Sequence, residues 1–245
     1  MAKLALLLEL TRHQNKQKAR REQHSPRDSA GYTLLELLVA ILIVGIIAAI
    51  GAPGWLSFTN QRRVGKANDV IFNALQEAQS QAKNRKLSYS VAFRNSAGKV
   101  PEVAVYPTKQ TDPSDSSKTI DVDPTKLPKS NWRSLGQELA LKPGQVTLGT
   151  NIDTENAKTG NVSYNLSNDA DIAKKKITFD YQGTLPTDTN PKPSLPLIIV
   201  VAASKGNTTT DANESTTRCV KVTTLLGGIQ TARGKECDPS NQINQ

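Results

Sequence analysis

An uncharged apolar run near the N-terminus constrains the fold more than any other feature of this sequence. From Leu37 to Ala52 no side chain is charged or strongly polar, and Glu36 stands directly before the run. An α-helix of about 20 residues crosses the hydrocarbon core of a bilayer. A soluble helix that is apolar on every side needs a large protein core around it. The rest of the chain is too polar to supply that core, so the run predicts a membrane span.

The residues that flank the run predict its orientation. Six Lys or Arg side chains lie in residues 12–31, against three in residues 59–78. Because basic residues favour the cytoplasmic side of a membrane, we expect a cytoplasmic N-terminus and a C-terminal part on the opposite side. An ordinary secretory signal is not predicted. The small residues suited to cleavage, Ser29, Ala30 and Gly31, precede the run, whereas a secretory signal is cut after it.

The junction between the basic leader and the apolar run resembles a known processing site. Residues 31–36 read Gly-Tyr-Thr-Leu-Leu-Glu and lead directly into the run. The sequence has a basic leader, a Gly, an aromatic residue, Thr-Leu-x-Glu and an apolar span, in this order. This order resembles the N-terminus of type IV prepilins and type II secretion pseudopilins. The resemblance implies that a prepilin peptidase cuts after Gly31 and methylates the new amine of Tyr32. Tyr32 replaces the commoner Phe, and Glu36 falls on the family's acidic fifth position.

Charge compensation gives Glu36 a predicted role in assembly. An ionised carboxylate at the apolar layer is costly and usually has a partner. Cleavage after Gly31 creates a positive amine at Tyr32, about one helical turn from Glu36 and near the positive end of the helix dipole. In a packed filament, the amine of a neighbouring subunit can supply the same compensation. We therefore expect Glu36 to dock subunits; the alternative is a side chain that snorkels to the headgroups.

The helix is predicted to continue beyond the membrane. Pro53 removes one backbone hydrogen bond and bends a helix, so we expect a kink there; the alternative is that the helix ends. Beyond Pro53, apolar residues recur at helical spacing from Val64 to Ala82, with charged and amide side chains on the opposite face. This pattern predicts a transmembrane part over residues 32–58 and an amphipathic continuation over residues 59–86.

A β-rich domain is predicted over residues 87–245. Apolar or alternating runs are separated by Pro, Gly, Asn and Asp clusters, which is typical of short antiparallel strands. The expected strands cover residues 87–93, 103–106, 146–148, 162–166, 176–181, 195–203 and 219–225. Residues 106–130 are expected to form a loop. It holds four Asp residues without the spacing of an EF-hand, so a solvated loop is favoured over the alternative of a calcium site, and no metal ligand is assigned.

The resulting fold class is α+β. We expect a cleaved basic leader, residues 1–31, and then a long N-terminal helix. The first half of this helix spans the membrane, and its amphipathic second half packs on an antiparallel β-sheet or sandwich.

Two cysteines near the C-terminus, Cys219 and Cys237, allow one disulfide. A small, even cysteine count beyond a membrane span is consistent with an oxidising compartment. Their spacing lacks the paired Cys and His ligands of a zinc site. We expect a Cys219–Cys237 bond that pins the C-terminal tail to the last strand; the other interpretation is two unpaired thiols.

Three patches narrow the resemblance to minor pilins and pseudopilins of the GspH/FimT type: residues 52–63, 74–83 and 218–227. Some members of this branch bind DNA for uptake through a C-terminal turn in which alternating Arg residues follow a Gly. This chain departs from that pattern, because no Arg directly follows Gly227. The cations available for DNA phosphates are Arg218, Lys221, Arg233 and Lys235. Four scattered cations are also typical of a solvated edge strand.

Composition favours a structural role over catalysis. The net charge is +9, of which +4 lies in residues 1–31, so the remainder is too mildly basic for a dedicated nucleic-acid domain. Both histidines, His13 and His24, precede Gly31, so the mature chain lacks the commonest general base. No phosphate-cradling Gly-rich motif is present. We expect neither a catalytic residue nor a cofactor.

These features, with the resemblance, predict a non-enzymatic minor pilin or pseudopilin of a type IV pilus or type II secretion machine. Its expected partners are prepilin peptidase, other pilins of the filament, the inner-membrane assembly platform and the lipid bilayer. The resemblance implies a single-pass protein of the inner membrane with a periplasmic domain, which then enters a pilus or pseudopilus. The alternatives are a DNA-uptake receptor of the same fold and a singly anchored domain that never polymerises.

Overall fold

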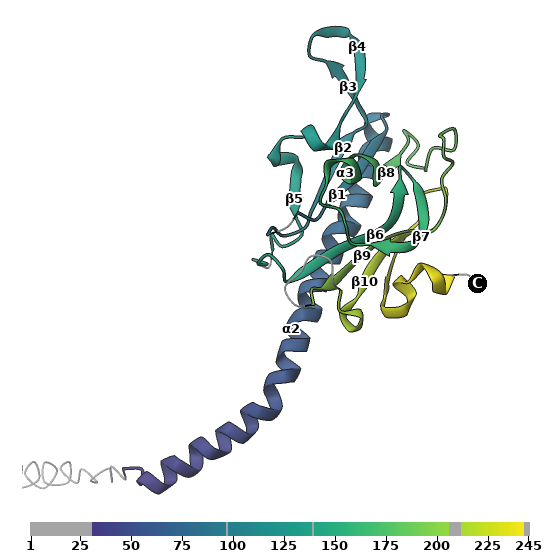
Figure 1. The fold of residues 1–245 in the computed structure, drawn as a ribbon. Helices are drawn as coiled ribbons and strands as arrows, with labels where there is room; N and C mark the ends of the chain where they lie inside the picture. The colour runs from purple at the N-terminus through teal and green to yellow at the C-terminus, as the bar shows by residue number, and fades with distance from the viewer. Residues whose placement is uncertain (1–30, 97, 139, 206–211, 243–245) are drawn as a thin grey trace, which may run out of the picture. The chain divides into compact units, whose positions relative to one another are not determined.

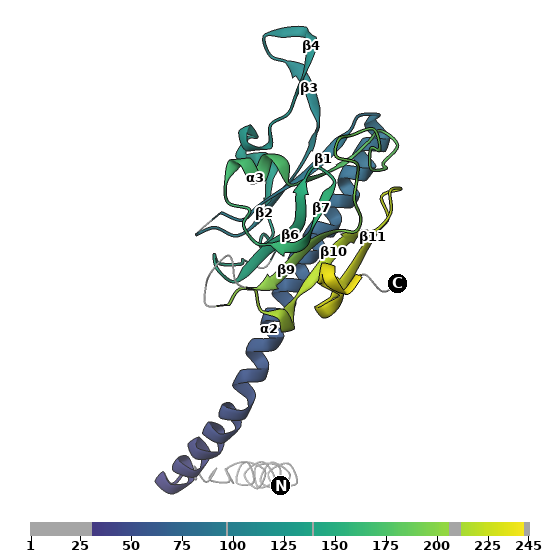
Figure 2. The same ribbon diagram turned by 45° about the vertical axis from the view of Figure 1, so that its right-hand side comes forward.

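The computed structural model describes residues 31–96, 98–138, 140–205 and 212–242 (Figures 1 and 2). The leader predicted over residues 1–31 lies outside these ranges except for Gly31. The chain divides into two compact units, residues 1–51 and Ala52–Gln245. The domain boundaries predicted from the sequence stay predictions.

The described part of the first unit is the apolar half of a long helix, α2 (Leu34–Arg85). Residues Leu34–Gly51 have a mean hydropathy of 2.8 and are long and apolar enough to cross a membrane. Every described residue in this stretch is exposed to solvent. An apolar helix surface without a protein cover is the arrangement expected of a segment whose environment is lipid.

In the second unit, α2 carries the predicted amphipathic stripe. The helix is continuous through residue 53, so it does not end at Pro53. The side chain of Pro53 lies outside the described part, and the kink stays a prediction. Seven apolar residues on one face are fully buried: Val64, Ala67, Ile71, Ala74, Leu75, Ala78 and Ala82. Four of the seven are alanines, whose small side chains let the sheets approach the helix closely.

Two antiparallel sheets pack on this stripe. The first has the order β5-β2-β1-β8, with strands β1 (Tyr89–Arg94), β2 (Glu102–Pro107), β5 (Trp132–Ser134) and β8 (Lys176–Phe179). The second has the order β11-β10-β9-β6-β7, with strands β6 (Val146–Thr154), β7 (Ala157–Ser163), β9 (Leu197–Ala203), β10 (Arg218–Val222) and β11 (Ile229–Arg233). The α+β prediction is therefore confirmed.

A single core joins the helix to both sheets. Ile71 and Leu75 of α2 belong to the same buried cluster as Phe93 of β1 and Ile199 of β9. The strand β9 is buried along its whole length, as its run of apolar residues predicts. A smaller cluster covers the outer face of each sheet, one around Trp132 and the other around the two cysteines.

Short helices fill the connections between strands. They are η1 (Pro124–Lys126), η2 (Lys129–Asn131), α3 (Asp169–Lys174), η3 (Glu214–Thr216), η4 (Gly234–Cys237) and η5 (Pro239–Gln242). The helix α3 places Ile172 in the outer cluster of the first sheet.

The prediction of a loop over residues 106–130 is wrong in part. The strands β3 (Lys109–Asp112) and β4 (Asp115–Asp121) form a hairpin that projects from the sheets (Figures 1 and 2). Its side chains are almost all exposed, so the alternation of apolar and polar residues that marks a half-buried strand is missing. The tip is closed by Asp112, whose Oδ1 accepts a hydrogen bond of 2.8 Å from the backbone of Ser114.

Two further strand predictions need correction. The strand expected at residues 162–166 is β7, which ends at Ser163. Tyr164 and Leu166 are instead partly or fully buried in different clusters, so their alternation reflects side-chain burial rather than strand pairing. The strand expected at residues 219–225 ends at Val222, and β11 follows it, so β10 is not the last strand.

Two glycine turns are tied to α2 by one side chain. Gln79 donates hydrogen bonds through Nε2 to the carbonyl oxygens of Gly183, at 2.8 Å, and Gly227, at 3.2 Å. Both glycines have a φ of +78°, a region that other residues rarely adopt. A Cβ on Gly227 would lie 2.5 Å from Gln79 Nε2 and 2.7 Å from Gly183 O. The turn between β10 and β11 therefore requires glycine at position 227.

We predict that Gly227→Ala destabilises the second unit by roughly 2–4 kcal/mol, through backbone strain and overpacking. The measurement is urea unfolding of the full chain in detergent, followed by near-ultraviolet circular dichroism. Gly160→Ala is the matched control, because a Cβ there meets nothing within 4 Å. Equal unfolding midpoints for the two variants would refute this account of the turn.

Candidate processing and assembly site

The start of α2 is fixed by a cap at Thr33. Its Oγ1 accepts a hydrogen bond of 3.1 Å from the backbone N–H of Glu36, and its carbonyl oxygen accepts one of 3.1 Å from Leu37. Thr33 and Glu36 thus occupy the two positions of the S/T-x-x-E capping box. Sequence reasoning missed this cap, although the spacing of the two residues was the signal for it.

The cap leaves the predicted scissile bond outside the helix. Gly31 and Tyr32 precede Leu34, the first helical residue, and Tyr32 is 79% exposed. A Cβ built on Gly31 would meet nothing within 4 Å. Folding of this chain therefore places no steric demand for glycine at position 31, so such a demand would come from an enzyme that binds the segment.

Glu36 lies in the first turn of α2, where an acid interacts favourably with the positive end of the helix dipole. Its side chain is exposed. This position supports helix initiation in a single chain, independently of any neighbouring subunit. A test of the docking role therefore has to preserve the capping role.

The predicted Cys219–Cys237 disulfide is present, with a Cα–Cα distance of 5.6 Å. It joins β10 to η4 and is buried beside Ile198 and Val200 on the outer face of the second sheet. The bond therefore holds the segment that follows β11 against the sheet.

The four cations considered for DNA contacts do not share one face. Val220 and Val222 of β10 point into the core with α2. Because side chains alternate along a strand, Arg218 shares their face, whereas Lys221 lies on the opposite face with Cys219. Arg233 of β11 pairs directly with Arg218. Lys235 lies in η4 and lines a separate cavity.

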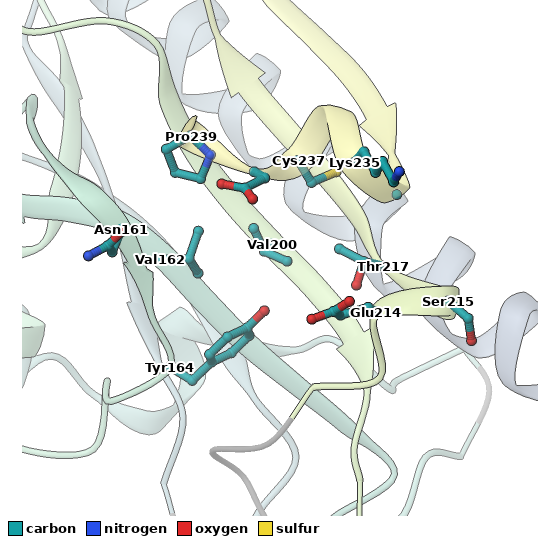
Figure 3. Close-up of a pocket in the computed structure, with 12 residues that line it drawn as sticks. Asn161, Val162, Tyr164, Val200, Glu214, Ser215, Thr217, Lys235, Cys237 and Pro239 are labelled. Carbon is teal, nitrogen blue, oxygen red and sulfur yellow. The ribbon is translucent and has the colours of Figure 1, made fainter. Parts of the chain in front are cut away.

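That cavity has a volume of about 470 Å³ and lies over the outer face of the second sheet (Figure 3). Val200 and Cys237 contribute apolar lining, and the Tyr164 hydroxyl points into the space beside Glu214. Burial, with a smaller contribution from Glu214, raises the pKa of Tyr164. Sequence reasoning named Lys235 and Cys237 for other roles but did not predict this cavity, because its lining comes from segments far apart in the chain.

Within the described residues, no group of three His, Cys, Asp or Glu side chains is placed to hold a metal ion. In the hairpin, Asp112 and Asp115 accept hydrogen bonds from Ser114 and Ser117. These bonds lower the pKa of both carboxyls. The carboxylates therefore serve as turn acceptors.

Comparisons with known proteins agree with the geometry of the N-terminal segment. Residues 26–52 match the family model described as the prokaryotic N-terminal methylation motif. The chain is also similar to the type IV major pilin protein PilA of Myxococcus xanthus (strain DK1622), with 36% identity over 78 residues. That match covers 32% of this chain and 34% of the relative, so the chain spans about a third of the curated relative's length. No solved structure matches the chain.

The predicted resemblance to type IV pilin-like proteins is therefore confirmed, because the chain carries their N-terminal methylation motif and has a type IV pilin homologue. The narrower resemblance to the GspH/FimT branch is not established by these matches. The motif spans the capped helix start, both residues of the predicted cleavage site and the apolar half of α2.

We predict that the Cys219–Cys237 bond contributes about 3 kcal/mol to the stability of the second unit, by restricting the unfolded chain. Reduction should lower the urea midpoint of the wild-type chain by a corresponding amount. The same reductant should leave a Cys219→Ser/Cys237→Ser variant unchanged. Alkylation of both thiols in unreduced, denatured protein would show that the bond does not form.

Proposed function

We propose that this chain is a non-enzymatic minor pilin or pseudopilin. It is made as a precursor, cut after Gly31 by prepilin peptidase and methylated on Tyr32. The helix α2 then carries it into a type IV pilus or a type II secretion pseudopilus. The observation that carries this proposal is the methylation motif over residues 26–52, placed at the capped start of a helix whose first half is apolar and exposed.

The two halves of α2 support assembly through the helix. The apolar half is suited first to lipid and then to the apolar helices of neighbouring subunits, because both environments exclude water. The second half is occupied by the sheets through its buried stripe. Neighbouring pilins and the inner-membrane assembly platform are therefore the proposed partners of the apolar half.

The basic leader supports a single-pass inner-membrane precursor with its N-terminus in the cytoplasm. The Cys219–Cys237 disulfide supports a periplasmic location for the second unit, because such bonds persist in oxidising compartments. After the histidines of the leader are removed, the chain has no imidazole to act as a general base, which favours a structural role over an enzymatic one.

We predict that the mature chain begins with methylated Tyr32. The intact mass of membrane-extracted protein should show loss of residues 1–31 and gain of one methyl group. Gly31→Glu should block cutting, because a bulky charged side chain obstructs binding of the segment by the peptidase. The fold itself should tolerate the change, because position 31 is unobstructed. Gly31→Ala is the control and should still be cut. Recovery of only the full-length wild-type chain, in a strain with active prepilin peptidase, would contradict the proposal.

We predict that Glu36→Gln is inserted and cleaved but enters filaments poorly. Gln preserves the size of the side chain and suits the capping box, so helix initiation should survive. Only the charge is lost. Removal of one partner from a buried charge pair costs about 3–5 kcal/mol, which is enough to suppress incorporation.

The measurement for Glu36→Gln compares sheared-filament and membrane fractions of cells that make either the variant or the wild type. Glu36→Asp, which keeps the charge, is the matched control and should recover part of the incorporation. If Glu36→Gln is cleaved and enters filaments as well as the wild type does, Glu36 is not the docking charge.

A further inference from the structure

Two arginines are direct cross-strand partners at one end of the second sheet. Arg218 of β10 and Arg233 of β11 are direct partners in the antiparallel register, so their side chains lie on the same face. Like charges directly opposite each other destabilise a sheet. Among the described residues, neither guanidinium takes part in an ion pair or a side-chain hydrogen bond. Folding alone therefore gives no reason for this pair.

The Arg218–Arg233 pair lies at one end of the second sheet. This end packs on the residues of α2 that are closer in sequence to the apolar run. The guanidinium carbon of Arg218 lies 3.5 Å from the position that a Cβ on Gly65 would take. The turn beyond the other end of β10, at Gly227, contacts Gln79 further along α2. The strand β10 thus runs along the helix, and its arginine end is at the level of the first turns of α2 that the sheets cover.

A third cation and two aromatic residues lie on the same stretch of α2. Arg62 precedes Gly65 by three residues and therefore shares its side of the helix. The Arg62 guanidinium lies 5.6 Å from the ring centroid of Phe58. Trp55 and Phe58 are 72% and 52% exposed. Exposed aromatic rings followed by basic side chains are typical of the level of lipid headgroups.

Two acids close to this stretch in sequence or by contact, Asp69 and Glu138, form no ion pair with these arginines in the part of the chain that the structure describes. Asp69 lies one turn beyond Gly65 and forms no ion pair within the described residues. Glu138 pairs with Lys66, at 3.8 Å between two exposed side chains. Arg62, Arg218 and Arg233, called the basic cluster below, take part in no ion pair with any residue that the structure describes.

We propose that the basic cluster binds the phosphate groups of anionic phospholipids, in the leaflet of the membrane where α2 emerges. The guanidinium group fits phosphate oxygens through paired hydrogen bonds. A phosphate between Arg218 and Arg233 also removes the repulsion that the sheet register imposes. Arg62 follows Phe58, the last residue of the predicted transmembrane part, by about one helical turn, which places the cluster close to the headgroups by sequence alone.

Lipid is favoured over DNA as the source of the phosphate. Tight DNA binding is built from many phosphate contacts on one surface, whereas Lys221 lies on the opposite face of β10 from Arg218. The aromatic residues that precede the cluster are characteristic of a membrane boundary. The inference rests on the membrane anchoring in the proposed function and not on filament assembly. Phosphate binding by the basic cluster adds headgroup contacts to the anchoring that the apolar run provides.

The test uses the full chain in lipid nanodiscs of phosphatidylcholine, with or without phosphatidylglycerol. Co-elution with the discs establishes anchoring separately from headgroup binding. Thermal unfolding is followed by near-ultraviolet circular dichroism. The wild type should melt about 1–4 °C higher in the anionic discs. Arg233→Gln should lose this increment, and in phosphatidylcholine alone it should melt at or above the wild type, because its repulsion is relieved.

The control is Lys158→Gln, which removes an exposed cation from β7 at the opposite edge of the same sheet and should keep the full increment. High salt should abolish the increment in the wild type. Equal melting of the wild type in both discs, or an unchanged increment in Arg233→Gln, would overturn the proposal. So would an equal increment from duplex DNA or inorganic phosphate added to neutral discs, because the ligand would then be a soluble phosphate.

Discussion

The packing of a narrow alanine-rich stripe of α2 against two sheets is the contact on which the second unit depends. Ala67, Ala74 and Ala78 are fully buried, and the larger Ile71 and Leu75 lie between them in the same core. Burial of these side chains at about 25 cal/mol per Å² favours the packed arrangement. The small residues set how closely the strands approach, and Gln79 then fixes where the two glycine turns sit along the helix.

The distribution of apolar side chains around α2 differs between its two halves. Residues 37–51 are apolar on every side and exposed, whereas the residues of α2 after Thr59 are apolar on one side only. A stretch of aromatic and then basic residues separates the two patterns. Because α2 is continuous through residue 53, both patterns belong to one helical element.

Features with a strong periodicity or a small number of alternatives could be predicted from the sequence. The stripe from Val64 to Ala82 was visible because the helical period repeats over several turns. The disulfide was visible because only two cysteines exist. The strand β9 was visible because a run of apolar residues needs burial on both faces.

The remaining features carry no local signal of that kind. The exposed hairpin β3–β4 lacks apolar alternation, and β11 is an edge strand whose side chains are mostly exposed. The cavity beside Tyr164 depends on which distant segments the topology brings together. In the candidate site, the order of motif residues predicted Gly31, Tyr32 and Glu36 together. The capping role of Thr33 was missed because Thr33 and Glu36 belong to both the processing motif and the capping box.

That overlap has a physical consequence for the N-terminal segment. A capping side chain at Thr33 begins the helix immediately after the predicted cleavage site, so Gly31 and Tyr32 lie exposed before the helix while Glu36 is already in its first turn. In the proposed processing, removal of the leader leaves a helix that begins with this capped turn, in which Glu36 is held by the helical backbone. A charge whose position is fixed before its partner arrives loses less conformational entropy on assembly. Under the proposed docking role of Glu36, the cap supplies this order in each separate subunit.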